Sequence, residues 1–595
     1  MSNRPILIYD GDCSFCKFWV ERWKHVTGSA IDYAPYQEVS VQYPQIPKEN
    51  FEKSIQLILP GGEVFAGAHA AFRSLAFNSN YAWPLVFYER FSPFQFLSEL
   101  FYGFVAQNRV LFSHLTKLFI GRSTEPSTYF ISQRIFLAWL GLTYFFAFVS
   151  LGIQVKGLYG VRGILSVSEY LKAAEMVLGP RSLHLLPSLL WLNSSDFFLQ
   201  FLCWAGAILS IGLILGIAVF PISVFLWFAY LSFVATGQDF MSFQWDVLLL
   251  EAGFLSIFVA PLKLKFKTGQ GRGPSFAFVF LMRWLLFRLM FSSGLVKFAS
   301  GDTAWRNWTA LLFHYETQPL PTWIGWYVHQ LPARFHQFSV GVMFFVELFV
   351  PFLIFFPRRA RLFSVFAITS FQILIGATGN YCFFNFLTIG LCLWLIDDQS
   401  WPSALRAKLQ QVSTPNVHNP FIGLETTLRG CAAVLIFLLS FVQISPLAPF
   451  HLVNHYGLFA VMTTQRPEII VEGSSDGVTW LPYEFRYKPG DLKSKPAFIE
   501  PGQPRLDWQM WFAALSDYRR NKWFLRFCRR LLEGSPEVSA LLKTNPFANS
   551  PPQFIRAVVY QYHFTNLSQK RQTGTWWTRE RTGLYCPVLE SSSFQ

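Results

Sequence analysis

Two cysteines separated by two residues, Cys13 and Cys16, form the motif in this chain that is best suited to covalent chemistry. The apolar run 6–9 before them predicts a β-strand, and the spacing of apolar side chains over 17–23 predicts a helix after them. A thiol at a helix N-terminus lies near the positive end of the helix dipole, which favours the thiolate form. The sequence therefore predicts a redox-active dithiol on a turn from strand to helix.

Two other interpretations of the cysteine pair stay open at this point. A C-x-x-C pair is half of many zinc sites, and a motif can persist after its chemistry has been lost. Cys13 and Cys16 are the only cysteines in the first 120 residues, and neither His25 nor His69 has ligand spacing to them. We therefore expect no metal site and favour the redox interpretation.

Lys297, near the end of a long apolar segment, is a second candidate for chemistry. It follows Gly294 in the pattern G-x-x-K. Desolvation at a membrane boundary can lower the pKa of a lysine until the lysine serves as a base. The alternative, which we favour, is that its ammonium group extends to the polar interface.

Charged residues inside apolar segments form a third group, because such charges are costly in a bilayer and usually face a partner or a cavity. Asp246 begins one segment, and we expect it at the interface. Glu251 of the same segment is expected to pair with Arg283 or Arg288 of the next segment. Glu347 lies in a later segment. The alternative for this group is a polar cavity that takes a substrate or a lipid.

The composition is that of an integral membrane protein. Of 595 residues, 52% are hydrophobic and only 14% are charged, whereas soluble proteins carry about 25% charged residues. The net charge of +14 could indicate a nucleic-acid partner, but the basic residues gather at the ends of apolar runs. No nucleic-acid recognition motif is visible in the sequence. We expect the membrane lipid bilayer as a partner and no nucleic acid.

Nine apolar segments are candidates to span the bilayer. Basic residues gather in the links after the fourth, sixth and eighth segments, whereas the links after the third and seventh lack them. By the positive-inside rule this pattern predicts a cytoplasmic N-terminus and, with nine spans, an exported C-terminus. The first residues also lack the pattern of a signal peptide, which agrees with a cytoplasmic N-terminal domain. The nine segments are 129–151, 196–217, 219–236, 245–261, 276–299, 338–357, 361–378, 382–397 and 428–446.

Soluble sequence flanks the apolar segments on both sides. Residues 54–59 and 64–67 enclose a Pro-Gly-Gly-Glu turn and predict a hairpin near the N-terminus. Residues 467–473 and 478–487 enclose a Ser-Ser-Asp-Gly turn and predict a second hairpin near the C-terminus. The expected domains are an α/β domain over 1–120, a polytopic α-helical membrane bundle over 121–446 and a β-rich soluble domain over 447–595.

The N-terminal residues resemble the DCC family of thiol-disulfide oxidoreductase-like proteins. The resemblance covers residues 4–115 and depends on the Y-D-G-x-C-x-x-C opening and on the block 61–68. It implies a thioredoxin-like fold, with Cys13 as the nucleophile and Cys16 as the resolving thiol. It also implies that Asp10 and Asp12, inside the motif, contribute to binding or to the shape of the site, and that a cytoplasmic thiol reductant or oxidant is a partner.

From about residue 130 to its end, the chain resembles the lipase maturation factor family. Members are polytopic proteins that secreted lipases need in order to reach an active, assembled state. The resemblance implies an exported client protein, possibly a lipase, on the far side of the membrane. The blocks that carry it are 187–196, 291–298, 305–321, 454–459, 487–491 and 504–515. Candidates within these blocks for binding or functional structure are Trp305, Arg306, Trp308, His314, Glu316, Arg505, Asp507 and Trp508.

A weaker resemblance links the Gly294-to-Lys297 pattern, with Trp305 after it, to vitamin K-dependent carboxylases and their HTTM relatives. It implies that Lys297 is a catalytic base. The leading expectation is a maturation factor for exported proteins with an appended dithiol domain, in the bacterial inner membrane or the endoplasmic reticulum. The first alternative is a membrane oxidoreductase or carboxylase-like enzyme with a quinone-type cofactor, and the second is a non-catalytic scaffold.

Overall fold

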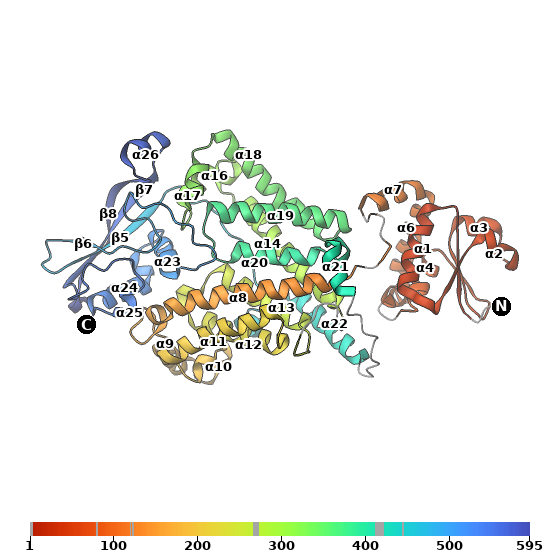
Figure 1. Cartoon of the computed structure of the whole chain (residues 1–595), viewed down its shortest axis with the longest axis horizontal. Coiled ribbons are helices and arrows are strands. Elements are labelled where there is room, and N and C mark those ends of the chain that lie inside the picture. Colours follow the sequence, from red (N-terminus) through yellow and green to blue (C-terminus); the bar gives the residue numbers. More distant parts are fainter. Residues whose placement is uncertain are drawn as a thin grey trace. The chain divides into compact units, whose positions relative to one another are not determined.

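The computed structural model describes residues 4–78, 81–119, 121, 124–125, 127–265, 273–410, 422–442 and 445–594 of the chain. The chain divides into two compact units, which Figure 1 draws in one view. The first unit comprises residues 1–128 with 356–362, and the second comprises 129–355 with 363–595. Each unit has its own core of buried apolar side chains.

The first unit contains a four-stranded sheet in the order β2-β1-β3-β4. Its strands are β1 (Ile6–Tyr9), β2 (Asp32–Pro35), β3 (Gln56–Ile58) and β4 (Val64–Ala66). β1 pairs in parallel with β2 and antiparallel with β3, and β3 pairs antiparallel with β4. The hairpin expected over 54–67 is therefore confirmed, with Leu57 opposite Phe65.

Helices cover both faces of this sheet (Figure 1). On one face, Val20 of α1 and Ala70 of α4 pack with Leu7 and Leu57 of the strands. On the other face, Phe51 of α3 packs with strand residues such as Ile8. The expectation of an N-terminal α/β domain is confirmed. The helices are α1 (Ser14–Thr27), α2 (Tyr36–Val39), α3 (Lys48–Lys53), α4 (Gly67–Leu75), α5 (Trp83–Arg90), α6 (Ser92–Gln107) and α7 (Arg109–Phe119).

Large apolar side chains stand exposed along α5, α6 and α7. Phe96, Leu100 and Phe104 of α6 are each more than half exposed, and Val110 of α7 is 75% exposed. Such a surface is unusual for a soluble domain and marks a contact with another apolar phase. We call this set the apolar face. Its members are Trp83, Val86, Phe87, Phe91, Phe96, Leu97, Leu100, Phe101, Phe104, Val110, Leu111 and Leu118.

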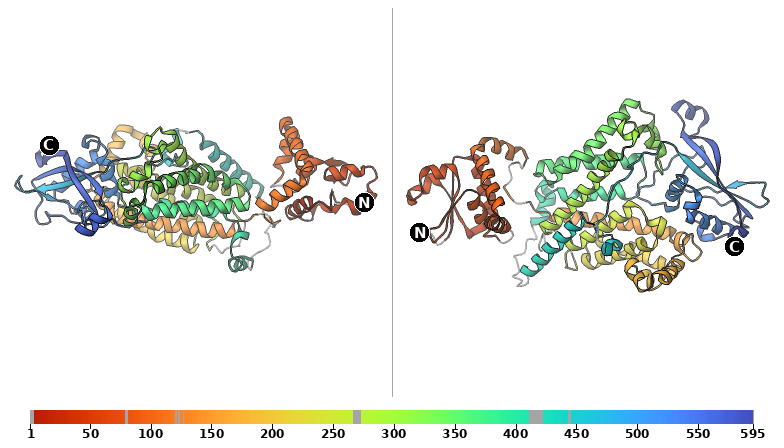
Figure 2. Two further views of the ribbon diagram at one scale, coloured as in Figure 1. Left: turned by 90° about the horizontal axis from the view of Figure 1, so that it is seen from above. Right: turned by 180° about the vertical axis from the view of Figure 1, so that it is seen from behind.

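The second unit contains the membrane-type helices. Within the described residues, six helices are long and apolar enough to span a bilayer. α8 and α11 pack along one another, as the views of Figure 2 show. The six are α8 (Phe130–Tyr159), α11 (Asp196–Leu215), α12 (Val219–Thr236), α14 (Phe276–Ala299), the run Ala333–Phe355 that begins with α18 (Ala333–Phe344), and α19 (Arg358–Thr378).

The expected count of nine spans is not supported by the described residues. The segment 245–261 forms α13 (Gln244–Val259) and the segment 382–397 forms α20 (Phe384–Cys392) with a short extension. A helix of 16 residues rises about 24 Å, which is less than the roughly 30 Å of a hydrocarbon core. The segment 428–446 lies in α22 (Ile422–Leu439), of which only Arg429–Leu439 counts as a shorter apolar helix. Apolar composition alone therefore does not separate a full span from a shorter buried helix.

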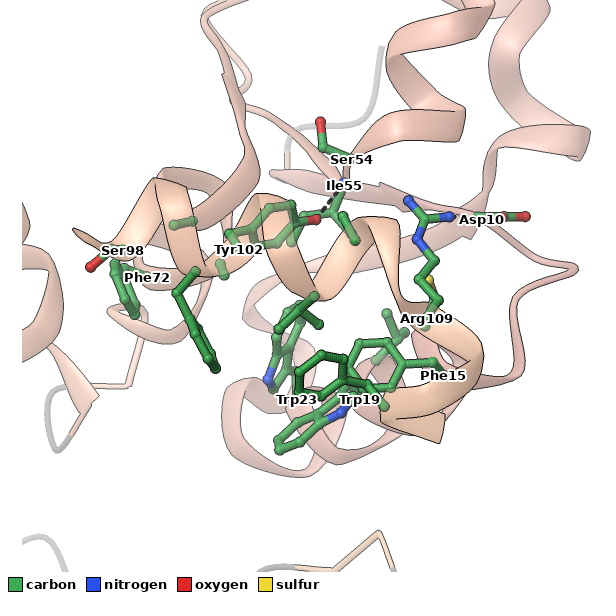
Figure 3. Close-up of a pocket in the computed structure, with 18 of the residues that line it drawn as sticks. Asp10, Phe15, Trp19, Trp23, Ser54, Ile55, Phe72, Ser98, Tyr102 and Arg109 are labelled. Carbon is green, nitrogen blue, oxygen red and sulfur yellow. Dashed lines mark hydrogen bonds and ion pairs between the residues drawn. The ribbon is translucent and has the colours of Figure 1, made fainter. Parts of the chain in front are cut away.

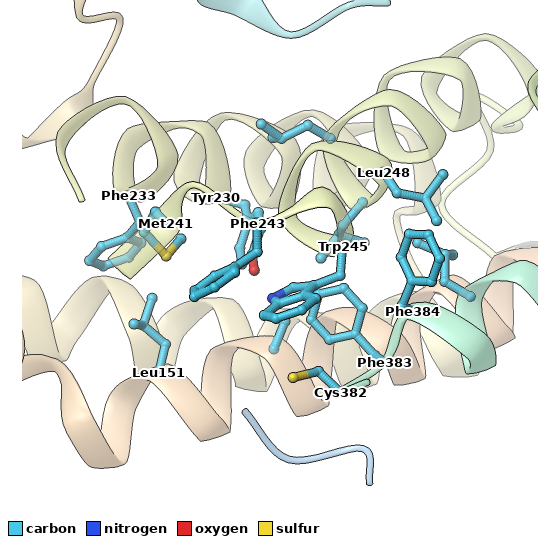
Figure 4. Close-up of a cluster of buried hydrophobic side chains, with 14 of the residues drawn as sticks. Leu151, Tyr230, Phe233, Met241, Phe243, Trp245, Leu248, Cys382, Phe383 and Phe384 are labelled. Carbon is cyan, nitrogen blue, oxygen red and sulfur yellow. The ribbon is translucent and has the colours of Figure 1, made fainter. Parts of the chain in front are cut away.

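The short helices are core elements of the second unit. Trp245 and Leu248 of α13 are buried among side chains of α8 and α12, as Figure 4 shows. Phe383 and Phe384, at the start of α20, reach the same cluster (Figure 4). These segments are apolar all round because protein surrounds them.

The C-terminal region forms a second four-stranded sheet, in the order β6-β5-β7-β8. The expected hairpin is confirmed, because β5 pairs antiparallel with β6, although β6 is only two residues long. The strands are β5 (Pro467–Ser474), β6 (Leu481–Pro482), β7 (Phe554–Phe564) and β8 (Trp577–Glu590). The helices used below are α23 (Arg505–Ala514), α24 (Lys522–Leu532) and α25 (Pro536–Ser539).

The two ends of α8 contact different parts of the second unit. At its start, the backbone N–H groups of Phe130 and Ile131 donate to the carboxylate of Asp398 at 2.9 and 2.8 Å. Near its end, Gln154 donates to the carbonyl of Gln503 at 2.7 Å. One turn later, Gly157 lies so close to α25 that a Cβ atom there would be 2.5 Å from the carbonyl oxygen of Glu537. The C-terminal region therefore packs at the carboxyl end of α8 (Figure 1).

Candidate functional site

The cysteine pair lies where β1 gives way to α1, and a sulfur atom caps the helix. The backbone N–H of Cys16 donates to Sγ of Cys13 at 3.2 Å, as N–H groups usually donate to an oxygen at this position. The Cys16 thiol also donates to Sγ of Cys13, at 2.6 Å. Both donors converge on one sulfur, which can therefore hold negative charge.

The two thiols differ in acidity. The hydrogen bond from the Cys16 thiol, assisted by the backbone N–H and by the guanidinium of Arg109, lowers the pKa of Cys13 to about 6 against the opposing effect of burial. The same hydrogen bond, together with burial, raises the pKa of Cys16 far above its ordinary value. Near neutral pH, Cys13 is a thiolate and Cys16 a thiol, which is the arrangement that a nucleophile and a resolving thiol require.

Asp10 and Asp12 shape the loop before the cysteines. Asp10 accepts from the backbone N–H of Asp12 at 3.0 Å and from Arg109 at 3.2 Å. The amide of Gln37 donates to both carboxylates, at 3.0 and 3.2 Å. At Gly11, a Cβ atom would lie 2.7 Å from Pro35, so a side chain does not fit there. The aspartates thus hold the loop, while Gln37 and Arg109 are site residues that the sequence did not reveal.

An apolar cavity of about 640 Å³ opens beside the dithiol (Figure 3). Cys16 belongs to its wall, together with aromatic rings from α1, α4, α6 and α7. The hydroxyl of Tyr102 accepts from the backbone N–H of Ile55 at 3.1 Å, which ties α6 to the start of β3. Ligand pockets commonly enclose roughly 300–1,000 Å³. The wall includes Cys16, Trp19, Trp23, Phe72, Leu97, Ser98, Phe101, Tyr102 and Arg109.

Lys297 is buried in the second unit and forms an ion pair. Its Nζ lies 2.7 Å from both carboxylate oxygens of Glu347, and its residue is only 6% exposed. The ammonium group is therefore enclosed by protein and paired with Glu347, and its extension to the polar interface of a membrane stays a prediction. A Cβ atom at Gly294 would lie 2.8 Å from the Cβ of Glu347, so the glycine of the G-x-x-K pattern makes room for this pair.

The segment after Lys297 packs partly into the protein. Trp305 is buried and donates through Nε1 to the carbonyl of Phe459 at 2.9 Å. Trp308 is half exposed and lies over Gly341. Arg306 is exposed and lies near Gly301.

Two polar candidates of the same segment contact other segments. Nε2 of His314 lies 3.1 Å from the hydroxyl of Tyr381, and burial lowers the pKa of this histidine to about 4. Glu316 accepts from the backbone N–H of Phe564 in β7 at 2.7 Å. The segment 305–321 thus connects the membrane helices to the C-terminal sheet.

Arg505 and Asp507 do not pair with one another. Arg505 makes a two-pronged contact with Asp246 of α13, at 2.9 and 2.8 Å, and neither side chain is exposed. Asp507 accepts from the backbone N–H groups of residues 487 and 488 at 2.8 and 2.9 Å. Trp508 packs edge-on against Trp245, with ring centroids 4.7 Å apart. Asp246 is therefore a buried anchor for α23. Its position at the membrane interface stays a prediction.

The expected partner of Glu251 is confirmed as Arg288. Glu251 also accepts from the hydroxyl of Tyr456 and from the backbone N–H of Asn454, at 2.8 and 2.9 Å. Arg283 instead donates to the carbonyl of Trp394 at 2.9 Å. Within the described residues, no group of three or more His, Cys, Asp or Glu side chains is arranged to hold a metal ion.

Three family models match successive parts of the chain. Residues 7–114 match the DCC1-like thiol-disulfide oxidoreductase model. Residues 131–403 match the lipase maturation factor transmembrane domain, and residues 452–587 match the lipase maturation factor C-terminal domain. The dithiol therefore lies in the part that matches the thiol-disulfide oxidoreductase model. The buried ion pairs lie in the parts that match the two lipase maturation factor models.

Curated relatives cover most of the chain. "Lipase maturation factor 2" of Xenopus laevis is 36% identical over an alignment of 582 residues, which covers 77% of this chain and 82% of that protein. "Lipase maturation factor 2" of Homo sapiens is 35% identical over 588 residues, with 77% and 82% covered. "Lipase maturation factor 1" of Mus musculus is 35% identical over 508 residues, with 78% and 88% covered. No solved structure matches the chain.

Proposed function

The chain belongs to the lipase maturation factor family, and from that premise we propose that it is a membrane-embedded factor that brings exported lipases to their active state. The observation that carries the proposal is that the relatives' similarity extends over 77% of the chain, through both the membrane and the C-terminal models. We assign the maturation function to the membrane domain 121–446 and the C-terminal domain 447–595, with the lipase as client.

The two ends of α8 support an orientation for the client-binding domain. If α8 crosses the bilayer, residues before Phe130 and the C-terminal domain lie on opposite sides, because the latter packs around Gln154 and Gly157. Basic residues gather at the start of α8 and at the start of α19, where Arg358, Arg359 and Arg361 occur. By the positive-inside rule we place that side in the cytoplasm and the C-terminal domain on the exported side.

For the N-terminal domain, 1–120, we propose thiol-disulfide exchange. The crossover β1-α1-β2, followed by the β3-β4 hairpin and α4, fits the thioredoxin-like arrangement expected from sequence. Cys13 is the nucleophile and Cys16 resolves the mixed disulfide, and the pKa of about 6 for Cys13 supports these assignments. With the orientation above, the dithiol faces cytoplasmic redox partners and does not oxidise the client directly.

The carboxylase-like alternative has less support. It assigns the catalytic base to Lys297, whose ammonium is held between both oxygens of Glu347 at 2.7 Å. A substrate would have to displace the Glu347 carboxylate before it reached this nitrogen. We therefore regard this ion pair as a link between α14 and the helical run of Glu347.

The test is a lipase co-expression assay in cells that lack the endogenous factor. Secreted lipase activity per unit of lipase protein is expected to depend on this chain. The Cys13→Ser/Cys16→Ser variant is expected to keep most of that activity, because the family similarity to lipase maturation factors begins after the dithiol. Equal specific activity of the lipase with and without the chain would sink the proposal.

A further inference from the structure

The cavity beside the dithiol has the properties of a ligand site and not of a packing fault. Its wall is almost entirely apolar and aromatic, yet it contains the Cys16 sulfur. Leu97 and Phe101 belong both to this wall and to the apolar face, since they are 60% and 63% exposed. The cavity therefore opens onto the most apolar surface of the first unit, and a ligand that enters there must itself be apolar.

Two hydrogen-bond donors of the cavity wall lack an acceptor. Nε1 of Trp19 is buried and has no hydrogen-bond partner among the residues that the structure describes. The Tyr102 hydroxyl accepts from Ile55, and within the same residues its own proton has no acceptor. An unsatisfied buried donor destabilises the folded state. A ligand with carbonyl oxygens on an apolar body would satisfy both groups.

The charged group of the wall is already occupied. Arg109 donates to Asp10 at 3.2 Å and to the carbonyls of Glu52 and Lys53 at 2.7 and 2.8 Å. A carboxylate or phosphate ligand would have to compete with these contacts. The wall thus favours a neutral ligand over an anion.

We propose that this cavity binds a lipophilic quinone, which exchanges two electrons with Cys13 and Cys16. In the oxidising direction, the Cys13 thiolate and the Cys16 thiol form one S–S bond and give up two electrons and the single proton that the pair holds. The quinone takes up the two electrons, that proton and a second proton from water, and its two carbonyl oxygens become the hydroxyls of a hydroquinone. Trp19 and Tyr102 are assigned to bind the carbonyl oxygens, and the apolar face is assigned to pass the quinone from the bilayer. In the sequence, only residues 120–129 separate α7 from α8.

This inference concerns the electron partner of the dithiol and goes beyond the maturation of lipases. The result of the lipase assay does not decide this inference, because lipase maturation is expected to proceed without the two cysteines.

The test uses the full chain in lipid nanodiscs, reduced and freed of reductant, without oxygen. The probe is decylubiquinone, whose ring carbons all carry substituents, so that thiols do not add to the ring. We expect one hydroquinone per chain, measured by absorbance, with the loss of two alkylatable thiols at Cys13 and Cys16, measured by mass spectrometry. No oxidation of the pair within hours would overturn the proposal.

Matched variants separate binding in the cavity from reaction in solution. Ser98→Trp fills the cavity from α6, and we expect the second-order rate to fall at least tenfold, whereas Gln107→Trp, at an exposed position of the same helix, leaves it unchanged. Trp19→Phe keeps the ring but loses the donor and is expected to raise the half-saturating quinone concentration about three- to tenfold. Trp204→Phe, in α11 of the second unit and outside both the cavity wall and the apolar face, is its control.

Two of these variants can also contradict the proposal. An unchanged rate in both Ser98→Trp and Trp19→Phe would mean that the quinone oxidises the thiols without entering the cavity. The rate at which iodoacetamide alkylates Cys13 reports whether each variant keeps the folded site, so a loss of fold is not mistaken for a blocked cavity.

Discussion

A sulfur atom stands at the start of α1 where most helices carry an oxygen. The Cys13 sulfur receives one backbone and one thiol hydrogen bond, and these contacts account for its acidity better than the helix dipole alone. The proton that Cys16 shares with it is the one that must leave when a disulfide forms. The reactivity of the pair therefore depends on which of the two sulfur atoms carries the one proton that they share.

The first prediction concerns that proton. In a Cys431→Ser background, which removes an exposed thiol, the alkylation rate of Cys13 should rise with a midpoint near pH 6. Cys16→Ala removes the donor and should move the midpoint up by about one pH unit or more. Cys16→Ser keeps an O–H donor, so it should stay closer to the parent while accumulating mixed disulfides in cells. Equal midpoints for the Ala and Ser variants would contradict the hydrogen-bond explanation.

The second prediction concerns Glu500, at the junction between the C-terminal region and α20. Burial raises its pKa from 4.5 to about 8, although Tyr381 and Asn385 donate to it. The folded protein therefore binds a proton that the unfolded chain releases, and stability falls as pH rises from about 4.5 through about 8. Between pH 5.5 and 8.5 we expect the melting temperature to drop by about 2–5 °C.

Two variants check the source of this pH dependence. Glu500→Gln keeps the shape and loses the charge, so its melting temperature should change less across the same range. Glu590→Gln, an exposed glutamate at the end of β8, should retain the parent slope. A parent slope that persists in Glu500→Gln would assign the effect to another group.

At the scale of elements, buried charges connect the membrane helices to the C-terminal region. α13 provides Asp246 for Arg505 of α23 and Glu251 for Tyr456 and Arg288. This helix is too short to be a secure span, yet it carries both of the anchoring carboxylates. Its function in the fold is to present these charges at the core of the second unit.

The third prediction tests the Asp246–Arg505 pair. Either Asp246→Asn or Arg505→Gln alone leaves a buried charge without its partner, at a cost of about 3–5 kcal/mol. The double variant should cost clearly less than the sum of the two, by melting temperature and by resistance of the C-terminal region to protease. Arg529→Gln, which breaks a solvent-exposed pair with Glu533, should cost about 1 kcal/mol or less. Strict additivity of the two single effects would contradict a direct pairing.

Local patterns in the sequence predicted much of the local structure. The helix after the cysteines, both hairpins and the helices of the C-terminal region follow from apolar spacing and turn residues. β8 was missed because its exposed run, Thr-Arg-Glu-Arg-Thr-Gly, lacks the alternation of a half-buried strand. The span count was too high because a buried core helix and a membrane helix are both apolar all round.

The candidate site was less predictable than the fold. The two cysteines were found because their spacing is a local pattern. Arg109 and Gln37 lie 99 and 27 residues from Asp10 in sequence, and such contacts depend on the packing of whole helices. The same limit applied to Lys297, since its partner Glu347 is 50 residues away.

At the scale of the whole molecule, the dithiol and the maturation machinery occupy separate compact units. The similarity to lipase maturation factors covers the second unit, and the similarity to thiol-disulfide oxidoreductases covers the first. Their union in one chain delivers a redox domain to the membrane in fixed ratio with the maturation factor. It does not require that one reaction drive the other.

The fourth prediction concerns the two sides of the membrane. A reporter fused to the N-terminus should report the cytoplasm, and one fused after Gln595 should report the exported side, because the proposed orientation puts the two ends of α8 on opposite sides of the membrane. Glycosylation or alkaline-phosphatase reporters make the measurement. A reporter fused between α10 (Ser182–Leu185) and α11, near Asn193, provides an internal exported-side control. If both termini reported the same side of the membrane, the proposed orientation would be wrong. In that case α8 would not be the single crossing that separates the N-terminal residues from the C-terminal domain.

The bond between Asp246 and Arg505 also sets an order of events during biosynthesis. The two residues are 259 positions apart, so at about 5–20 residues per second the carboxylate waits on the order of ten to fifty seconds for its arginine to be made. During that interval the nascent bundle contains the Asp246 carboxylate without its arginine partner. Membrane chaperones and proteases recognise unpaired groups of this kind. A ribosome that stops before α23 therefore releases a chain in which the Asp246 carboxylate has no arginine partner. Synthesis of the last domain supplies Arg505 and completes the pair.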